Sequence, residues 1–278
     1  MHSFQLSHSR ASLGLALMLT MLFILLVLQA PASRADEAAM RDKVAIITGT
    51  SYGLGRELAL LGSKHGMKLV MVDMRPEPSE QLAEQIRTQG GQAMVVEADL
   101  ALPESRARVI EAAMEQYGRI DYLFNNAGYS YLATLEQMDL EQARHQMDVN
   151  FWAYADLAQR VIPIMREQGG GTILNVSSIL GMRPGSPVMG HYAATKHALH
   201  GLFQSAAAEL RPENIKVFVA APAGMRTHIS KHSVGPAVSG EDRAADWEDP
   251  AIPARDIFEM IQQDTDQVIF NPGYIGRQ

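Results

Sequence analysis

The sequence predicts an α/β fold with a single doubly wound parallel sheet and helices on both faces. Three observations lead to this fold class. Short apolar runs alternate with helical stretches from about residue 40 to residue 278. Such alternation is typical of parallel strands joined by helices that cross over the sheet. A glycine-rich turn separates the first apolar run from the first helical stretch, and the second apolar run ends in an acid.

The first half of the predicted domain repeats a strand and a helix three times and then adds a fourth strand. The apolar residues 44–47 lead through the glycine-rich turn into a helix at residues 56–61, and residues 68–72 form the second strand. A helical stretch at residues 78–87 precedes a third strand at residues 92–97. Residues 103–117 are predicted to be helical because Val109, Ile110, Ala113 and Met114 share one face. Residues 120–124 form the fourth strand.

The second half continues the alternation. A helical stretch covers residues 140–168, and we expect two helices there, broken near Asn150. Residues 172–176 and 216–220 are predicted strands, with a helix at residues 191–210 between them. Residues 224–249 are polar and irregular, and a loop of that length suggests a lid. A helix near residues 255–263 and a strand at residues 267–270 complete one domain, residues 40–278.

The glycine-rich turn, Thr48-Gly49-Thr50-Ser51-Tyr52-Gly53-Leu54-Gly55, carries the first functional signal. A strand that breaks at glycines and re-enters as a helix leaves backbone N–H groups and the positive end of a helix dipole available to a pyrophosphate. Glycines permit the close approach that a Cβ would prevent. Their spacing differs from the general dinucleotide pattern, and such turns also serve as plain connections. The strand, turn and helix context strengthens the prediction.

Asp73 ends the second predicted strand, eighteen residues after Gly55. A carboxylate at this distance can accept hydrogen bonds from both hydroxyls of an adenosine ribose, and it would repel the 2′-phosphate of NADP. Met74 rather than a base follows it, although Arg75 is close. NAD is therefore the predicted cofactor, in preference to NADP. The alternative is a solvated acid that only ends a strand.

Composition excludes several classes of function. The net charge of −7 argues against a nucleic-acid partner. The absence of cysteine excludes disulfides, thiolate catalysis and zinc–thiolate sites. No metal site is predicted, because His228 and His232 share a helical spacing without an evident third ligand.

Residues 1–39 differ from the rest of the chain. No charged residue occurs from Ala11 to Leu28, a length at the lower edge of a membrane span. The segment predicts an N-terminal membrane anchor, with the catalytic domain cytoplasmic because the flank after it carries more Lys and Arg. Two alternatives remain open. One is a signal peptide cleaved near Ser33 or Asp36, followed by export, and the other is a cytoplasmic protein whose translation starts at Met40.

Tyr192 and Lys196 lie four residues apart on a predicted helix and so on one face. A nearby ammonium favours the phenolate, so we expect Lys196 to lower the pKa of Tyr192 below its usual value of about 10. A phenol adjusted in this way can exchange a proton with an alcohol oxygen near neutral pH.

From Lys43 onward the chain resembles the short-chain dehydrogenase/reductase family, which has the Rossmann fold. The glycine turn, Asp99, Asn125-Asn126-Ala127-Gly128, Asn150, Ser177-Ser178 and the Tyr192–Lys196 pair carry the resemblance. It implies that Tyr192 is the general acid/base, that Ser178 polarises the reacting oxygen, that Lys196 holds the nicotinamide ribose and that Asn150 steadies a linking water. The cofactor-binding residues that the motifs and the resemblance together imply are Gly49, Ser51, Tyr52, Gly53, Leu54, Gly55, Asp73, Asp99, Leu100, Asn126, Ala127, Gly128, Tyr192, Lys196, Pro222 and Thr227.

Three residues depart from the family pattern. Ser178 lies fourteen residues before Tyr192, one more than the family's usual spacing, so Ser177 is an alternative catalytic serine. Ala223 replaces the usual Gly after Pro222, and Thr195 replaces the usual Ser before Lys196. None of the three changes removes a group that hydride transfer needs.

The predicted function is hydride transfer between a small-molecule secondary alcohol or ketone and the nicotinamide of NAD, with Tyr192 as the acid/base. Met182, Met189 and Met225 flank the expected substrate opening, and a flexible apolar pocket suits a lipid-like or steroid-like substrate. The alternatives are an NADPH-preferring carbonyl reductase and a catalytically idle NAD-binding protein. The family commonly pairs the helices around residues 151–166 and 191–210 between subunits, so a homodimer or homotetramer is expected.

Overall fold

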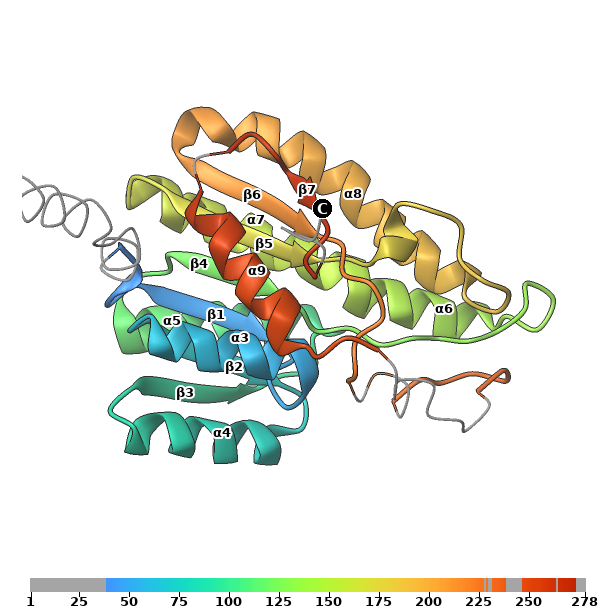
Figure 1. The fold of residues 1–278 in the computed structure, drawn as a ribbon, viewed down its shortest axis with the longest axis horizontal. Coiled ribbons are helices and arrows are strands. Elements are labelled where there is room, and N and C mark those ends of the chain that lie inside the picture. Colours follow the sequence, from blue (N-terminus) through green and yellow to red (C-terminus); the bar gives the residue numbers. More distant parts are fainter. Residues whose placement is uncertain (1–38, 228, 230–231, 239–246, 264, 274–278) are drawn as a thin grey trace, which may run out of the picture. The chain divides into compact units, whose positions relative to one another are not determined.

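Seven parallel strands form one sheet in the order β3-β2-β1-β4-β5-β6-β7 in the computed structural model (Figure 1). The structure describes residues 39–227, 229, 232–238, 247–263 and 265–273. The predicted fold class is confirmed. The strands are Val44–Thr48 (β1), Lys68–Asp73 (β2), Gln92–Glu97 (β3), Tyr122–Asn125 (β4), Gly171–Val176 (β5), Ile215–Ala220 (β6) and Ile269–Phe270 (β7).

Helices cover both faces of this sheet. On one face α5, α7 and α8 bury their apolar residues against β1, β4, β5 and β6. On the other face α3 packs against α4 and α9, and Phe258 of α9 stacks on Phe124 of β4. The helices, labelled as in Figure 1, are Gly53–Lys64 (α3), Pro76–Thr88 (α4), Pro103–Tyr117 (α5), Leu140–Met147 (α6), Ala153–Glu167 (α7), Gly190–Leu210 (α8) and Ala251–Gln262 (α9).

The break expected near Asn150 is a π-helical turn, Asp148–Trp152, that joins α6 to α7 without a loop. A π turn holds one residue more than an α turn and is common at functional sites. It leaves the side chain of Asn150 fully buried. The structure thus has two α-helices, as predicted, and the break between them is a π-helical widening in place of a loop.

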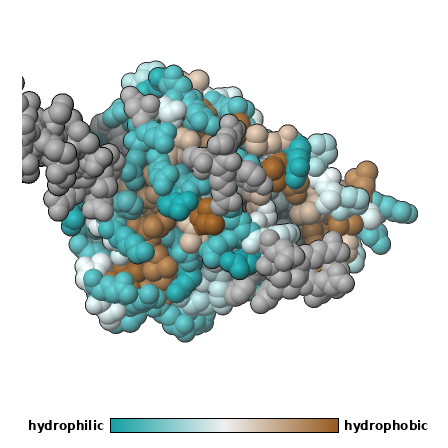
Figure 2. Space-filling view, viewed as in Figure 1, coloured by the Kyte–Doolittle hydropathy of each residue, from teal (hydrophilic) through white to brown (hydrophobic). Residues whose placement is uncertain are grey.

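The strands β1, β2, β4, β5 and β6 are buried along nearly their whole length, whereas β3 at the edge of the sheet is mostly half-buried or exposed. Every residue of β1 is buried, as expected for a parallel strand covered on both faces. The face of the described residues seen in Figure 2 is mostly hydrophilic, and hydrophobic side chains lie in small patches between the polar ones. The apolar residues of the central strands therefore supply the core.

Residues 1–40 cluster separately from residues 41–278. The apolar segment at residues 11–28, which carries the prediction of an anchor or signal peptide, lies outside the described residues. Within the described part of the chain, none of the helices combines the length and the apolar composition that a membrane crossing needs.

Candidate active site

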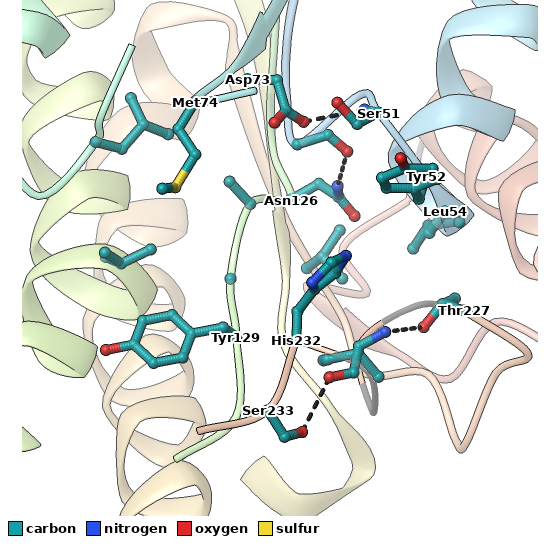
Figure 3. A pocket seen from close by; sticks show the side chains of 18 of the residues that line it. Ser51, Tyr52, Leu54, Asp73, Met74, Asn126, Tyr129, Thr227, His232 and Ser233 are labelled. Carbon is teal, nitrogen blue, oxygen red and sulfur yellow. Dashed lines mark hydrogen bonds between the residues drawn. The ribbon is translucent and has the colours of Figure 1, made fainter. Parts of the chain in front are cut away.

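A cleft of about 660 Å³ lies where the strands end in the glycine turn, Asp73, Ala98 and Ala127 (Figure 3). The carboxyl edge of an open parallel sheet is where this architecture binds ligands. Fourteen of the predicted site residues line the cleft: Gly49, Ser51, Tyr52, Gly53, Leu54, Asp73, Asp99, Leu100, Asn126, Ala127, Gly128, Tyr192, Lys196 and Thr227. The other four, Gly55, Asn150, Ser178 and Pro222, are not among its lining residues.

The glycine turn is shaped by close approaches that a side chain would block. Gly49 and Gly53 have φ values of +73° and +57°, which favour glycine. A Cβ on Gly55 would lie 2.1 Å from the carbonyl oxygen of Gly49, so Gly55 lets α3 pack against the turn instead of lining the cleft. Among the described residues no side chain caps the amino end of α3, and its first turn carries no acid. Its N–H groups therefore suit an anion.

Asp73 also fastens the turn to the end of β2. Its Oδ2 accepts a hydrogen bond from the Ser51 N–H at 3.0 Å, and its Oδ1 accepts one from the Arg75 N–H at 3.1 Å. Asp73 still lines the cleft. The carboxylate thus holds two loops in place and faces the position predicted for a ribose.

Asn126 ties the end of β4 to the same turn. Its Nδ2 donates to the carbonyl oxygens of Thr48 at 2.8 Å and of Gly49 at 3.2 Å. The hydroxyl of Thr48 in turn accepts from the N–H groups of Asn126 and Ala127. The predicted cofactor residue Asn126 therefore orders the floor of the cleft by bonds within the protein.

Tyr192 and Lys196 lie together at the amino-terminal part of α8. Lys196 is 3% exposed, its Nζ donates to the carbonyl oxygen of Val176 at 2.9 Å, and it lies 5.7 Å from the centre of the Tyr192 ring. The side chain of Ser178 acts on Tyr192 and lowers the pKa of its phenol, and its hydroxyl accepts from the Leu180 N–H at 3.2 Å. The hydroxyl of Ser177 instead donates to the carbonyl oxygen of Lys196 and bonds His200 at 2.8 Å. Of the two candidate serines, Ser178 is thus the one that changes the pKa of the phenol.

The pKa of Tyr192 differs from the sequence-based expectation. Burial raises the pKa of Tyr192 to about 12, and the hydrogen bond from Ser178 lowers it by a smaller amount. Desolvation also lowers the pKa of Lys196 to about 7. The expectation of a Tyr192 pKa below 10 was wrong for this structure, because the same burial that isolates the phenol also weakens the charge of its lysine neighbour.

Asn150 supports the site from beneath. Its Oδ1 accepts from the Tyr129 N–H at 3.1 Å, and its Nδ2 donates to the Tyr129 carbonyl oxygen at 3.0 Å and to the Thr195 hydroxyl at 3.3 Å. A Cβ on Gly128 would lie 3.0 Å from Asn150 Oδ1. Asn150 therefore connects the π turn, the loop after β4 and α8.

The described part of the predicted lid covers the cleft from the side of β6. Thr227 packs against Gly53, because a Cβ added at Gly53 would lie only 2.7 Å from Cγ2 of Thr227. Val234 pairs with the loop after β4 through its N–H to Ser130 and its carbonyl oxygen to Leu132. Figure 3 shows His232 pointing into the cleft between Tyr129 and Tyr52.

Pro222 lies outside the lining residues, and its carbonyl oxygen accepts from the Ile179 N–H. His228 lies outside the described residues.

Sequence reasoning missed a polar pair on the opposite wall. The hydroxyl of Tyr129 bonds His145 Nδ1 at 2.8 Å, and both residues line the cleft. The pKa of Tyr129 is raised to about 12, mainly by burial and to a smaller extent by the negative charges of the nearby Asp148 and Asp99. Tyr129 directly follows Gly128, so its place after the fourth strand was a usable signal. His145 comes from a helix whose rotation the sequence pattern did not fix.

Comparisons with known proteins agree with this geometry. The family model described as short chain dehydrogenase matches residues 43–235. The mouse (Mus musculus) protein dehydrogenase/reductase SDR family member 7B is 33% identical over 81% of this chain and 72% of its own length. A short-chain dehydrogenase/reductase from Burkholderia phymatum, solved in complex with NAD, has a TM-score of 0.75 at 26% identity, covering 83% of this chain and 89% of that chain. A metagenomic short-chain oxidoreductase solved in complex with NADP has a TM-score of 0.71 at 26% identity, covering 84% and 99% of the two chains.

The cleft fits the nicotinamide dinucleotide that this family uses. A cleft lined by the amino end of α3, by Asp73 and by a buried phenol and ammonium offers partners for phosphate, ribose and a reacting oxygen. The residues at its two ends come from different halves of the sheet, as the sequence motifs predict. The chain belongs to the short-chain dehydrogenase/reductase family and is an NAD(P)-dependent oxidoreductase that acts on small molecules.

Proposed function

We propose that the protein is an NAD-preferring oxidoreductase that moves a hydride between a secondary alcohol or ketone and the cofactor, with Tyr192 as the acid/base. The observation that carries the proposal is the buried Tyr192–Lys196 pair in the cleft, with Lys196 Nζ 5.7 Å from the centre of the Tyr192 ring and with Ser178 acting on the same phenol. A protein that only binds NAD has no use for that arrangement. The bound nicotinamide supplies the hydride acceptor or donor.

The residues divide the remaining work. A phenol with a pKa of about 12 is protonated at neutral pH, so Tyr192 is prepared to give its proton to a ketone oxygen. Ser178 donates a hydrogen bond to the same oxygen and steadies its developing charge. In the direction of alcohol oxidation Tyr192 must first lose its proton, and a protonated Lys196 favours that loss.

Asp73 supports the preference for NAD. Its carboxylate faces the cleft and would accept hydrogen bonds from ribose hydroxyls while repelling a 2′-phosphate. Replacing it, Asp73→Ala, should weaken NADH binding about tenfold or more, since a bond to a charged group is worth about 1.5–3 kcal/mol. The same change should narrow the difference between NADH and NADPH, measured by fluorescence titration. A wild-type protein that prefers NADPH would contradict the proposal.

The proposed substrate class is based on methionines at or near the cleft. Met225 lines it, and Met182 is 55% exposed near the 3₁₀ turn that follows Ser178. We propose a lipid-like or steroid-like secondary alcohol or ketone, since thioether side chains adapt to such surfaces. The test is NADH formation by the full chain with steroids, retinoids, sugars and aliphatic alcohols. Activity confined to the sugars would remove the apolar class, and NADH binding with no turnover of any compound would favour the idle binder.

We also propose that residues 11–28 remain as a membrane anchor with the catalytic domain cytoplasmic. The support is the charge-free apolar run and the greater number of Lys and Arg after it. Fractionation of cells that express the full chain, followed by N-terminal sequencing, is the test. A soluble product that begins near Ser33 or Asp36 would show cleavage instead.

A further inference from the structure

A buried serine–histidine pair joins the end of β5 to the helix of the proposed acid/base. His200 Nε2 lies 2.8 Å from the hydroxyl oxygen of Ser177, and the two residues are 8% and 3% exposed. The same hydroxyl oxygen lies 3.2 Å from the carbonyl oxygen of Lys196. Ser177 directly follows β5, and His200 lies one helical turn after Lys196 on α8. The pair therefore ties β5 to the part of α8 that carries Tyr192 and Lys196.

The hydrogen bonds of the pair have a fixed direction. A carbonyl oxygen only accepts, so the hydroxyl of Ser177 donates to Lys196. The oxygen of that hydroxyl then serves as an acceptor, and His200 donates to it from Nε2. Burial and, to a smaller extent, the positive charges of His197 and Lys196 lower the pKa of His200 below its usual value. His200 is therefore a neutral imidazole near pH 7, with its proton on Nε2.

The short turn that follows Ser178 packs against this pair. A Cβ added at Gly181 would lie 2.7 Å from His200 Nε2 and 2.7 Å from the hydroxyl oxygen of Ser177. Only a residue without a side chain lets the backbone come this close. Gly181 ends the 3₁₀ turn Ile179–Gly181, and its N–H donates to the carbonyl oxygen of Ser178 at 2.8 Å. Ser178 is thus held from both sides, by its neighbour Ser177 and by the turn that Gly181 closes.

His200 can reach the reaction only through these groups. It is not among the described residues that line the cleft, whereas Ser177, Tyr192 and Lys196 are. Ser178 acts on the phenol of Tyr192, so a displacement of its turn moves a group that the proposed reaction needs. A misplacement of about 1 Å at such a site can cost about 10²-fold in rate.

We propose that His200 is a positioning residue that holds Ser178 in place relative to Tyr192. It does so by donating a hydrogen bond to Ser177 and by packing against Gly181. The inference rests on the proposed oxidoreductase function and adds to it a residue outside the cleft. Its contribution appears in the rate of turnover and not in cofactor affinity, because its bonds join β5 to α8 and involve neither the glycine turn nor the end of β2.

Steady-state turnover and NADH affinity of the full chain test the proposal. The probe is the one of the steroids, retinoids, sugars and aliphatic alcohols that wild type oxidises fastest with NAD. His200→Leu removes the donor and keeps an apolar side chain on α8. It should lower kcat about two- to tenfold, the range expected for one net hydrogen bond, and leave the Kd of NADH within about twofold of wild type. His200→Gln, which presents an amide donor in place of the Nε2–H group, should restore kcat to within about twofold of wild type.

Changes to the partners of His200 test the same linkage. Ser177→Ala removes the acceptor, and a variant that combines it with His200→Leu should lose no more kcat than the more affected single variant. Gly181→Ala places a Cβ against the pair and should lower kcat at least as much as His200→Leu does. These changes reach the turn of Ser178 from three different positions, so a shared loss of kcat points to the turn itself.

Two matched controls make the same chemical changes elsewhere on α8. His197→Leu replaces a part-buried histidine whose Nδ1 bonds the carbonyl oxygen of Ala193. Gly190→Ala adds a Cβ that meets open space among the described residues. Both variants should keep the kcat of wild type. Thermal unfolding of each variant checks that it is folded, and if His200→Leu does not fold, Ser177→Ala compared with His197→Leu decides in the same way.

The positioning role is overturned if a folded His200→Leu keeps the kcat of wild type, if His200→Gln fails to restore kcat, or if NADH affinity falls as much as kcat. A wild-type protein that turns over none of the compounds has a different meaning. It would overturn the proposed function itself, and it is recognised before any variant is compared.

Discussion

Tyr192 and Lys196 share one buried environment, and the pKa of each depends on it. The phenol is 7% exposed and the lysine 3% exposed. Both groups are therefore driven toward their neutral forms, the phenol by a raised pKa and the amine by a lowered one. Each can be tested by removing the single group that titrates.

Replacing the phenol with a phenyl ring, Tyr192→Phe, should leave NADH affinity within about twofold of wild type and lower turnover by about 10²–10⁴. The ring and its packing stay, while the transferable proton is lost. Steady-state kinetics and fluorescence titration measure the two effects. Turnover within tenfold of wild type would reject Tyr192 as the acid/base.

The lysine predicts a pH dependence of stability for the protein without added cofactor. Its pKa is about 7 when folded and 10.5 as the reference value, so between these values the unfolded chain binds more protons. The free energy of unfolding should then rise with pH, by up to about 1.4 kcal/mol per pH unit. Urea unfolding between pH 7.5 and 9.5 avoids the range above pH 10, where the raised pKa of Tyr192 acts in the opposite direction. The chain has no cysteine to titrate there.

Lys196→Met should flatten that pH dependence, because the titrating group is gone. Lys68→Met is the matched control, because Lys68 in β2 is only partly buried. A slope that persists in Lys196→Met would show that the charge of Lys196 does not set it.

Single residues could be predicted from the sequence where a motif specifies both their type and their spacing. Tyr192, Lys196 and Asp73 lie in the cleft as the pattern predicts. The choice between Ser177 and Ser178 could not be made from spacing, because it depends on which of the two side chains acts on the phenol of Tyr192. The pKa of Tyr192 was mispredicted because spacing gives the distance to a charge but does not give the desolvation.

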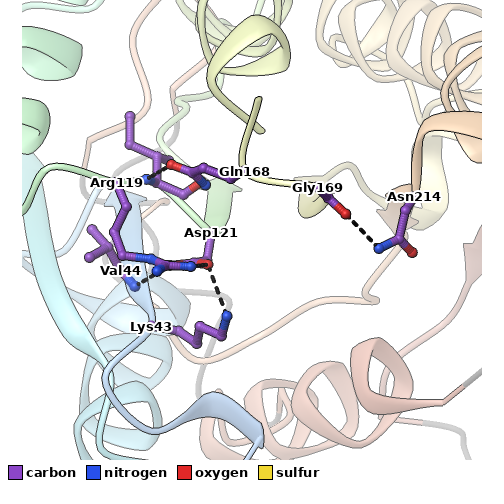
Figure 4. A network of polar contacts seen from close by, with 8 residues as sticks. Lys43, Val44, Arg119, Asp121, Gln168, Gly169 and Asn214 are labelled. Carbon is purple, nitrogen blue, oxygen red and sulfur yellow. Dashed lines mark hydrogen bonds and ion pairs between the residues drawn. The ribbon is translucent and has the colours of Figure 1, made fainter. Parts of the chain in front are cut away.

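Among the secondary-structure elements, β1 and β4 are joined at their amino ends by a polar network centred on Asp121 (Figure 4). The carboxylate accepts from the Val44 N–H at 2.9 Å and from Arg119 Nε at 2.8 Å, and Lys43 Nζ lies 3.3 Å away. Although burial opposes it, these partners hold the pKa of Asp121 below its usual value. Asp121 thus links two adjacent strands and remains ionised.

Asp121→Asn should lower the free energy of unfolding by about 1–3 kcal/mol. The expected loss of stability is moderate because the side chains of Lys43 and Arg119 are 39% and 42% exposed. The lowered pKa of Asp121 contributes stability that is present above about pH 4 and is lost as the pH falls through the pKa of the folded state. The free energy of unfolding of the variant should therefore fall less steeply in acid than that of wild type. Asp266→Asn, which breaks the exposed ion pair with Arg211, should cost less than about 1 kcal/mol. Equal losses from both changes would contradict the prediction.

The elements themselves could be predicted well from the alternation of apolar runs. β3 and α5 match their predicted bounds, whereas α3 begins three residues before its predicted start because helical backbone runs into the glycine turn. The π turn at Asp148–Trp152 was not predictable in form. Its extra residue is stabilised by the bonds from Asn150 to Tyr129 and Thr195, which come from distant parts of the sequence.

For the whole molecule, α8 presents an outer face that suits a second copy. Its exposed residues carry no charge before Glu209, and they include Ala194, Gly201, Leu202 and Ala208. Trp152, at the start of the neighbouring helix α7, is 53% exposed. We expect a dimer or tetramer through these helices, because contiguous uncharged surface of this kind favours association.

Light scattering of wild type at micromolar concentration should give a mass of at least two chains, and Leu202→Glu should shift it toward one chain. Leu135→Glu places the same charge on a loop residue that is 86% exposed, and it should leave the mass unchanged. A monomeric wild type would refute the assembly.

The network around Asp121 also bears on how this protein can change over evolutionary time. The network lies at the amino end of β1, and the glycine turn begins at Thr48, its carboxyl end. The two ends are about 13 Å apart, for four residue steps along a strand. Substitutions that far apart, with no shared partner, change stability nearly additively. A lineage can therefore accumulate stability at the amino edge first and afterwards accept destabilising changes of the residues that line the cleft. Selection for new chemistry and selection for a stable fold then act on different ends of the same sheet.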